Sequence, residues 1–368
     1  MPNVLIDSDG HVSERDEVIL DYLPEPFTGR RELLQRPIFP LGDNFHRMAE
    51  SLLDGRKGED RGDEDRSALP IWQDLMDESG MKWSALYPTR GLYIHEWHSP
   101  EWGGAVARGY NDWLYDAYVS KDSRLKGIAL LHLHDINAAV AELRRCVLEL
   151  GFEGVVLMCG GLQQPLGDEH YFPLYEEAQR LDVGVAVHGG AAAALGGETA
   201  TALWKVRAMS HPSGQISSFM SMVNGGVLDT FPQIRLAYLE AGCGWVPYLV
   251  DRMDRVYYGR GARLSSVLKQ SPSDHLAEGR IFVHAELDEK MLPVVAQTAS
   301  REDIFMYASD YPHEPWSEMI KELDEFVERS DLSDALKTNT LSTSAQRFYH
   351  LDEDGNRTGP RAHAANGQ

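Results

Sequence analysis

Residues 154–188 read GVVLMCGGLQQPLGDEHYFPLYEEAQRLDVGVAVH. The two ends of this stretch, Gly154–Met158 and Gly184–His188, are short apolar runs of the kind found in strands that are covered on both faces of a parallel sheet. Between them, residues 174–182 place apolar side chains at helical spacing. Two parallel strands need a crossover connection of this kind. The stretch therefore predicts a strand–helix–strand unit of an α/β fold.

The same alternation of short apolar runs and helical segments extends along most of the chain. Eight apolar runs, each too short for a helix, occur at residues 4–6, 84–87, 127–131, 154–158, 184–188, 234–239, 280–284 and 304–308. Helical spacing occurs at residues 138–150, 174–182, 214–229, 246–257, 288–299 and 318–329. Eight strands that alternate with helices predict a (β/α)₈ TIM barrel.

The lengths of the connections indicate the domain organisation. We expect the 368-residue chain to form one barrel over residues 1–350, with a long insertion after the first strand at about residues 12–80 that packs over one end of the barrel. Within it, residues 54–66 (DGRKGEDRGDEDR) carry charges of both signs and no aromatic side chain, which is typical of a solvated loop. Residues 351–368 are polar and are expected to form a disordered tail.

The charge and the hydropathy pattern exclude several kinds of partner. Subtracting 57 acidic from 35 basic residues gives a formal net charge of −22, which repels phosphate backbones and anionic headgroups. No run of about 18 apolar residues occurs, and the first residues, MPNVLID, lack the regions of a signal peptide. We expect a cytoplasmic protein that binds a small molecule and neither nucleic acid nor membrane.

Polar side chains occur where five of the predicted strands end, and in a barrel of this type the chemistry lies at the carboxyl ends of the strands. In chain order these side chains are Asp9 and His11 at the first strand, His188 at the fifth, Glu240 at the sixth, His284 at the seventh, and Asp310 and His313 at the eighth. Imidazoles and carboxylates on one rim predict a catalytic or metal site.

Asp9, His11, His188 and Asp310 are the candidate ligands of a divalent metal. Side chains two residues apart on an extended segment point to the same side, so Asp9 and His11 can bind one cation together. A nitrogen of His188 and an oxygen of Asp310 would complete a site of two imidazoles and two carboxylates for a first-row ion. Each residue alone has a structural alternative, namely a turn acceptor for Asp9, a core histidine for His188 and a helix cap for Asp310.

Four motifs combine at these strand ends. They are DSDGH at residues 7–11, VAVHGG at 185–190, LEAGCGWVPYLVDRMD at 239–254 and SDYPH at 309–313. Together they resemble the second amidohydrolase family, the branch of the amidohydrolase superfamily that includes metal-dependent aromatic-acid decarboxylases and some hydrolases. The resemblance runs from about residue 6 to residue 348. It implies a (β/α)₈ barrel with metal ligands at Asp9, His11, His188 and Asp310.

Glu240 is a departure from the pattern of that family, whose members commonly have a histidine at the end of the sixth strand that binds a second metal or transfers protons. Here Glu240 is a candidate proton-transfer residue or ligand, and a helix cap or ion pair is its structural alternative. His211 and His284 are candidate proton-transfer residues on the same rim. With Glu240 and His313 they would suffice for a second cation, and such a carboxylate-rich site favours iron or manganese.

Two residues are candidates for substrate binding. Arg90 lies just past the second predicted strand, and its forked donors suit a carboxylate substrate. An ion pair with an acid of the insertion is the alternative for Arg90. Trp316 lies at the same end and is a candidate wall for an organic substrate or a packing residue. His95 and His98, in the stretch YIHEWHSP at residues 93–100, are expected in a loop over the site.

Three functions remain open from the sequence. The first is lytic: one Zn, Mn or Fe ion polarises an oxygen or activates water, and a small carboxylate-bearing molecule is hydrolysed or decarboxylated. The second is a dinuclear non-haem iron/manganese monooxygenase that hydroxylates a small amino or carboxylic acid. The third is a metal-binding barrel subunit that supports a catalytic partner chain. Trp and Tyr residues in the insertion and at residues 245–258 predict a homo-oligomer, or a hetero-oligomer with a related subunit.

Overall fold

The computed structural model describes residues 4–40, 67–190 and 203–359. Eight parallel strands follow one another around the molecule in chain order. They are β1 (Leu5–Val12), β2 (Met81–Pro88), β3 (Leu125–Leu130), β4 (Gly154–Met158), β5 (Gly184–His188), β6 (Leu236–Tyr238), β7 (Ile281–His284) and β8 (Phe305–Met306). The Ser8 N–H donates to the Tyr307 carbonyl and the Asp310 N–H donates to the Asp9 carbonyl, both at 3.0 Å. These bonds join β1 to the chain after β8, so the predicted (β/α)₈ barrel is confirmed.

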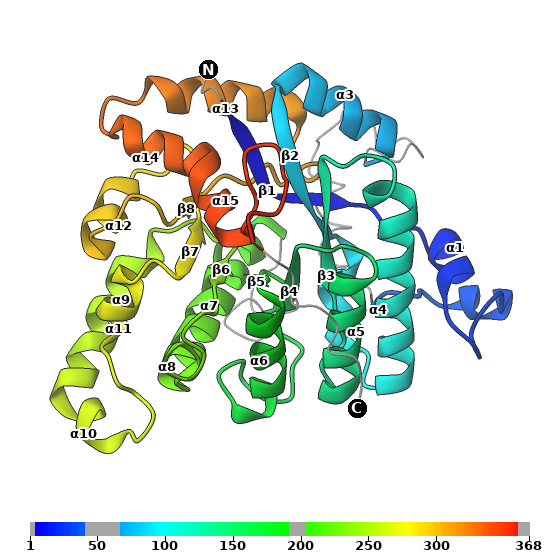
Figure 1. Cartoon of the computed structure of the whole chain (residues 1–368), viewed down its shortest axis with the longest axis horizontal. Helices are drawn as coiled ribbons and strands as arrows, with labels where there is room; N and C mark the ends of the chain where they lie inside the picture. The colour runs from blue at the N-terminus through cyan, green and yellow to red at the C-terminus, as the bar shows by residue number, and fades with distance from the viewer. Residues whose placement is uncertain (1–3, 41–66, 191–202, 360–368) are drawn as a thin grey trace.

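Helices cover the outside of the strands, and α4, α5 and α6 stand side by side along one side of the barrel (Figure 1). The longer helices are α3 (Leu69–Ser79), α4 (Pro100–Leu114), α5 (Ile136–Leu148), α6 (Phe172–Leu181), α7 (Leu203–Asn224), α9 (Trp245–Val256), α12 (Leu292–Ala299) and α13 (Trp316–Glu328). The short α-helices are α1 (Asp16–Ile19), α8 (Val227–Thr230), α10 (Ala262–Leu264), α11 (Pro272–Ala277), α14 (Asp334–Thr338) and α15 (Ser344–Tyr349). The 3₁₀ and π turns are η1 (Leu20–Tyr22), η2 (Arg31–Gln35), η3 (Arg90–Glu96), η4 (Tyr115–Val119), η5 (Glu169–Tyr171), η7 (Tyr257–Gly261) and η8 (Asn339–Thr343). Every residue of β4 and β5 is buried, as expected for strands covered on both faces.

Two elements differ from the sequence prediction in ways that affect the rim. Strand β1 continues to Val12, so Asp9 and His11 lie within the strand and not after it. Helix α7 begins at Leu203, well before residue 214, and continues through Pro212. Pro212 and Gly214 lower the helix propensity of this segment, and the observed helix overrides that local preference. His211 therefore projects from a helix.

The two segments outside the repeating pattern are described in part. In the insertion, α1, η1, η2 and α3 lie between β1 and β2, with Phe39 and Trp72 fully buried, and residues 54–66 lie outside the described residues. The first part of the predicted tail is ordered, which corrects that expectation. Leu351 pairs with Arg357, whose guanidinium lies 2.7 Å from the Glu153 carboxylate, and both side chains are only 10% exposed. This buried ion pair holds residues 351–359 against the barrel, and residues 360–368 lie outside the described range.

A search of the described residues finds no helix that combines the length and the apolar character needed to cross a membrane.

Candidate active site

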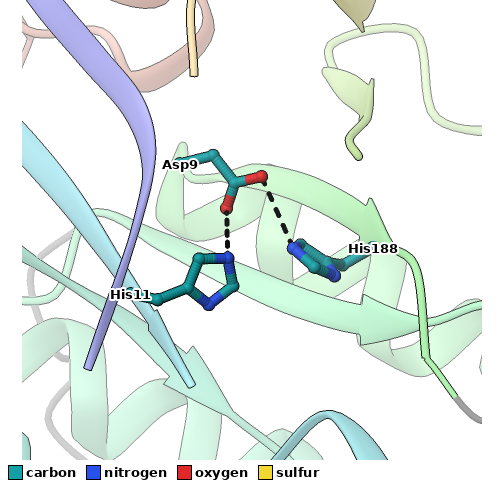
Figure 2. Close-up of side chains that lie close together, drawn as sticks. All are labelled: Asp9, His11 and His188. Atoms are coloured by element: carbon teal, nitrogen blue, oxygen red, sulfur yellow. Dashed lines mark ion pairs between the residues drawn. The ribbon is translucent and has the colours of Figure 1, made fainter. Parts of the chain in front are cut away.

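The structure brings the four candidate metal ligands together inside the barrel. The Asp9 carboxylate lies between two imidazoles, with Oδ1 3.5 Å from His11 Nε2 and Oδ2 3.4 Å from His188 Nε2 (Figure 2). Asp310 Oδ1 lies 3.4 Å from the same nitrogen of His11. Two atoms that each bind one ion at about 2.1 Å lie roughly 3–3.5 Å apart, so these separations suit a shared cation.

The orientation of the imidazoles supports a cation at this point. His11 Nδ1 donates to the Pro88 carbonyl at 2.9 Å, and His188 Nδ1 donates to the Gly189 carbonyl at 2.8 Å. Burial lowers the pKa of His11, so its Nε2 presents a lone pair to the two carboxylates. For His188 the Asp9 and Glu240 carboxylates outweigh burial and raise the pKa to about 10, so without a metal its Nε2 carries a proton toward Asp9. Burial raises the pKa of Asp9 to about 6, with further contributions from the Asp310 and Glu240 carboxylates. A divalent ion would take the place of the His188 proton and offset the buried negative charge.

An unusual backbone conformation aims two carboxylates into the site. Glu240 and Asp310 have φ values of 58° and 50°, in the left-handed region that non-glycine residues rarely adopt. The other non-glycine residues with positive φ, Asp182, Ser300 and His350, are ordinary helix C-caps. Glu240 and Asp310 instead follow β6 and β8 at the rim. Strain of this kind is concentrated at functional sites.

Replacing Glu240 by glycine is expected to stabilise the metal-free protein while it removes the carboxylate. Glycine adopts this φ without strain, so the free energy of unfolding should rise by about 1 kcal/mol. Urea denaturation of metal-free Glu240→Gly measures the gain, and Ser300→Gly, at φ 53°, is the matched control in a helix cap. A destabilised Glu240→Gly variant beside a stabilised control would show that the contacts of Glu240 outweigh its backbone strain.

Glu240 lies between the metal site and a second histidine. Its Oε2 atom is 3.4 Å from His188 Nδ1 and 3.4 Å from His211 Nδ1. A Cβ atom at Gly189 would approach Glu240 Oε2 to 2.7 Å, so a larger residue there would displace this carboxylate. Glu240, His211, His284 and Asp310 all line one cavity of about 570 Å³. The predicted proton-transfer candidates thus lie together beside the candidate metal ligands.

The same cavity has an acidic wall that the sequence analysis missed. The acidic wall consists of Glu286, Asp288, Glu314, Glu318 and Glu322. Partial burial, followed by the neighbouring carboxylates, raises the pKa of Glu286 and of Glu322, and both side chains remain exposed to solvent. Among the described residues that line the cavity there is no lysine or arginine. Glu314, Glu318 and Glu322 are spaced four residues apart in the sequence. The sequence does not show that they line the same cavity as the loop after β7.

Two other candidates, His313 and Trp316, lie near this site. His313 Nδ1 lies 2.7 Å from Asp310 Oδ1, and its Nε2 lies 3.1 Å from the Thr89 hydroxyl, so His313 orients Asp310 in this arrangement. Trp316 begins α13 but is not among the residues that line the cavity. The roles of His313 as a ligand and of Trp316 as a substrate wall stay predictions.

Arg90 forms an ion pair with an acid of the insertion, which is the alternative to substrate binding that the sequence left open. Its Nη1 lies 2.6 Å from Asp16 Oδ1, an acid of the insertion, and its Nη2 donates to Asp16 Oδ2 at 3.3 Å. The guanidinium also lies over the Phe39 ring, 5.6 Å from its centroid. Its forked donors are therefore used to hold the insertion against the segment after β2, and Arg90 does not line the cavity.

The change Arg90→Gln is expected to lower stability and to leave substrate affinity unaltered. Loss of the bidentate, partly buried pair should cost about 1 kcal/mol. Chemical denaturation and KM, measured side by side, check this expectation. An increased KM with unchanged stability would restore the substrate-binding role.

Comparison with known proteins identifies the family. The profile of the amidohydrolase family matches residues 81–351, a range that includes His188, Glu240 and Asp310. The chain belongs to the amidohydrolase family. The resemblance inferred from the four motifs is therefore confirmed.

Other amidohydrolase-family members are similar over most of the chain. The 2-amino-3-carboxymuconate-6-semialdehyde decarboxylase of Dictyostelium discoideum is 24% identical over 258 residues, which cover 70% of this chain and 69% of that protein. A solved 5-carboxyvanillate decarboxylase of Novosphingobium aromaticivorans, complexed with manganese and 4-hydroxy-3-methoxy-5-nitrobenzoic acid, has a TM-score of 0.69 at 18% identity, covering 95% of this chain and 96% of that one. An amidohydrolase of Mycobacterium avium subsp. paratuberculosis has a TM-score of 0.73 at 18% identity, covering 95% and 100%. The predicted enzyme class, a metal-dependent hydrolase or carbon–carbon lyase, agrees with these relatives.

Proposed function

We propose that this amidohydrolase-family chain is a manganese-dependent decarboxylase that removes a carboxylate from an aromatic or otherwise unsaturated carbon. The observation that carries the proposal is the meeting of two imidazoles and two carboxylates beside a cavity of about 570 Å³. A mixed nitrogen and oxygen donor set without thiolates suits manganese. The decarboxylase activity named for two of the similar proteins supports the choice of reaction.

Asp9, His11, His188 and Asp310 would hold the ion, which would supply a Lewis acid for an oxygen of the substrate. In the reaction the bond between the carboxyl carbon and the substrate carbon breaks, and CO₂ leaves. The electron pair stays on the substrate carbon, which takes a proton. The Glu240 carboxyl and the His211 imidazole, 3.4 Å apart in the cavity wall, are the groups that hold this proton.

His284 is the residue we assign to substrate orientation. It lines the cavity at the end of β7, and its buried Nδ1 atom has no hydrogen-bond partner. Burial lowers the pKa of His284 to about 4, so the imidazole is neutral at neutral pH. A neutral imidazole can accept or donate one hydrogen bond to a substrate without adding charge to the cavity.

The acidic wall narrows the class of substrate. Five carboxylates on one side of the cavity repel a second anionic group on the substrate, and they attract a positive one. The substrate that fits this field has a single carboxylate at the metal and an amino or uncharged group toward the wall. A polycarboxylate is disfavoured.

The test is a panel of aromatic and unsaturated carboxylates, each ¹³C-labelled at the carboxyl carbon, given to manganese-loaded protein in D₂O. Amino-substituted members and members with a second carboxylate are compared directly. We expect ¹³CO₂ from an amino or neutral member, one deuterium on the carbon that loses CO₂, and no turnover after chelation. Release of CO₂ only from dicarboxylates would overturn the substrate class, and no release from any member would overturn the reaction.

A dinuclear oxygenase is the second candidate function, because ligand atoms for a second cation are present. His11, Asp310 and His313 bring one ligand atom each within 4.8 Å of one another, and Glu240 lies between His188 and His211. An oxygen electrode and elemental analysis distinguish the two functions. Oxygen uptake with iron and a second metal per chain favours the oxygenase, and one manganese without oxygen uptake favours the decarboxylase.

We also propose that the chain self-associates through the region of α9 and η7. Tyr248, Val256 and Tyr258 project apolar surface there and are between 60% and 74% exposed. An exposed apolar cluster of this kind is typical of an interface. Sedimentation equilibrium should give a multiple of the chain mass, and Tyr248→Ser together with Tyr258→Ser should lower it. A monomer at micromolar concentration would contradict this proposal.

A further inference from the structure

Four histidines gather at a place that the decarboxylation scheme does not use. His95 lies in η3, His98 follows it, and His132 and His134 follow β3. The ring centroids of His132 and His134 are 4.6 Å apart, and those of His95 are 5.8 Å from His132 and 6.0 Å from His134. His98 stacks on His134 at 5.9 Å. None of the four lines the cavity of the active site.

The hydrogen bonds of this cluster leave a second ring nitrogen without a partner. His132 Nε2 donates to the Trp97 carbonyl at 2.8 Å, and His134 Nε2 donates to the Gly161 carbonyl at 3.3 Å. The Nδ1 atoms of both rings are buried and have no hydrogen-bond partner. His95 is 1% exposed, and neither of its ring nitrogens has a hydrogen-bond partner of ordinary geometry. A backbone carbonyl that fixes one nitrogen while the other stays available is typical of metal-binding histidines.

The surroundings are shaped to admit these rings. A Cβ atom at Gly103 on α4 would lie 2.4 Å from the His132 ring, and one at Gly161 would lie 2.9 Å from the Cβ of His95. Burial lowers the pKa of His95, and it lowers the pKa of His132 to about 4. Both rings are therefore neutral at neutral pH, which is the state that binds metal ions.

The spacing of the rings is close to that of histidines on one ion. With metal–nitrogen bonds of about 2.0–2.1 Å and tetrahedral angles, two imidazole centroids lie roughly 5 Å apart. The observed spacings exceed this value by at most about 1 Å. In the present arrangement no three nitrogens of the cluster all lie within 4.8 Å of one another. Rotation of the exposed His98 and of the half-buried His134, which would give up its long hydrogen bond to Gly161, would close the site.

We propose that His95, His132 and His134, with His98 as the ligand nearest solvent, form a second divalent-metal site whose expected ion is Zn²⁺. Imidazole donors without a carboxylate favour zinc over manganese. The ion would join η3 to the segment after β3, two neighbouring loops at the rim of the barrel. The proposal does not rest on the reaction catalysed at the first site.

The test compares metal-depleted wild-type protein with the variants His134→Asn and His98→Ala, each titrated with Zn²⁺ alone in equilibrium dialysis. His170→Asn, which removes an exposed histidine outside the cluster, is the matched control. We expect wild type and the control to bind one more tight Zn²⁺ per chain than His134→Asn. His98→Ala should keep this ion with affinity weakened about tenfold, or about 1.4 kcal/mol. Because stoichiometries are compared by difference, the number of ions at Asp9 and Asp310 does not affect the result.

Co²⁺ provides a second measurement on the same proteins. A four-histidine site should give the visible absorption of tetrahedral Co²⁺ in wild type and in Asp310→Asn, and this absorption should be missing from His134→Asn. Circular dichroism confirms that each variant is folded. Equal zinc stoichiometry in wild type and folded His134→Asn would overturn the proposal, as would Co²⁺ absorption that disappears with Asp310→Asn but persists in His134→Asn.

Discussion

Asp310→Asn is expected to release the active-site ion and to lower kcat/KM by about 10³-fold or more, which corresponds to roughly 4 kcal/mol of transition-state stabilisation. The substitution removes one of the two carboxylates, those of Asp9 and Asp310, that face His11 Nε2. Asparagine tolerates the left-handed backbone at this position, so the fold should persist. Elemental analysis after dialysis, together with turnover, gives the two measurements.

Asp324→Asn is the matched control, because Asp324 is an exposed acid on α13. It should keep both the ion and the activity. An Asp310→Asn protein with full metal content and normal turnover would contradict the assignment of Asp310 as a ligand.

Glu240→Gln is expected to lower turnover by about 10²–10⁴-fold while the ion bound by Asp9, His11 and Asp310 remains. Glutamine keeps the shape of the side chain but cannot exchange the proton that we assign to Glu240 and His211. Turnover and metal content are measured on the same sample. In the dinuclear alternative, the same change would instead remove one of two ions.

Glu286→Gln provides the comparison for Glu240→Gln, since it removes one charge from the acidic wall of the same cavity. This variant should change KM for an amino-substituted substrate more than kcat. Normal activity and normal metal content in Glu240→Gln would make Glu240 a structural residue and would contradict the proton-transfer role.

The barrel could be predicted from the sequence because strands that are buried on both faces consist of short runs of apolar residues. Strands β4 and β5 have the predicted bounds for this reason. The ends of β1 and β8 depend on hydrogen bonds between segments about 300 residues apart, such as Asp310 to Asp9. Periodicity along the chain contains no information about such pairs, so β1 is longer and β8 shorter than predicted.

The candidate site could be predicted in its composition and not in its geometry. The expectation that the chemistry lies at the carboxyl ends of the strands selected five residues, because each follows or ends an apolar run. They are Asp9, His11, His188, Glu240 and Asp310. The left-handed backbone at Glu240 and Asp310 has no signal in the sequence, since neither residue is a glycine. Arg90 shows the limit of reasoning from residue type, because a guanidinium suits Asp16 as well as it suits a substrate carboxylate.

Clusters formed by distant segments were the least predictable. The acidic wall joins the loop after β7 to α13, and the histidine cluster joins η3 to the segment after β3. Taken alone, each contributing segment has the composition of an ordinary solvent-exposed loop or helix face. Only the packing of the barrel shows that their polar side chains face one another.

Anomalous diffraction from crystals of the chain equilibrated with Mn²⁺ tests the central claim most directly, because it locates the ion without reference to a substrate. The account predicts one strong manganese peak bonded to Asp9, His11, His188 and Asp310 at about 2.0–2.2 Å. The absence of manganese at these four side chains, with full occupancy elsewhere in the barrel, would contradict it.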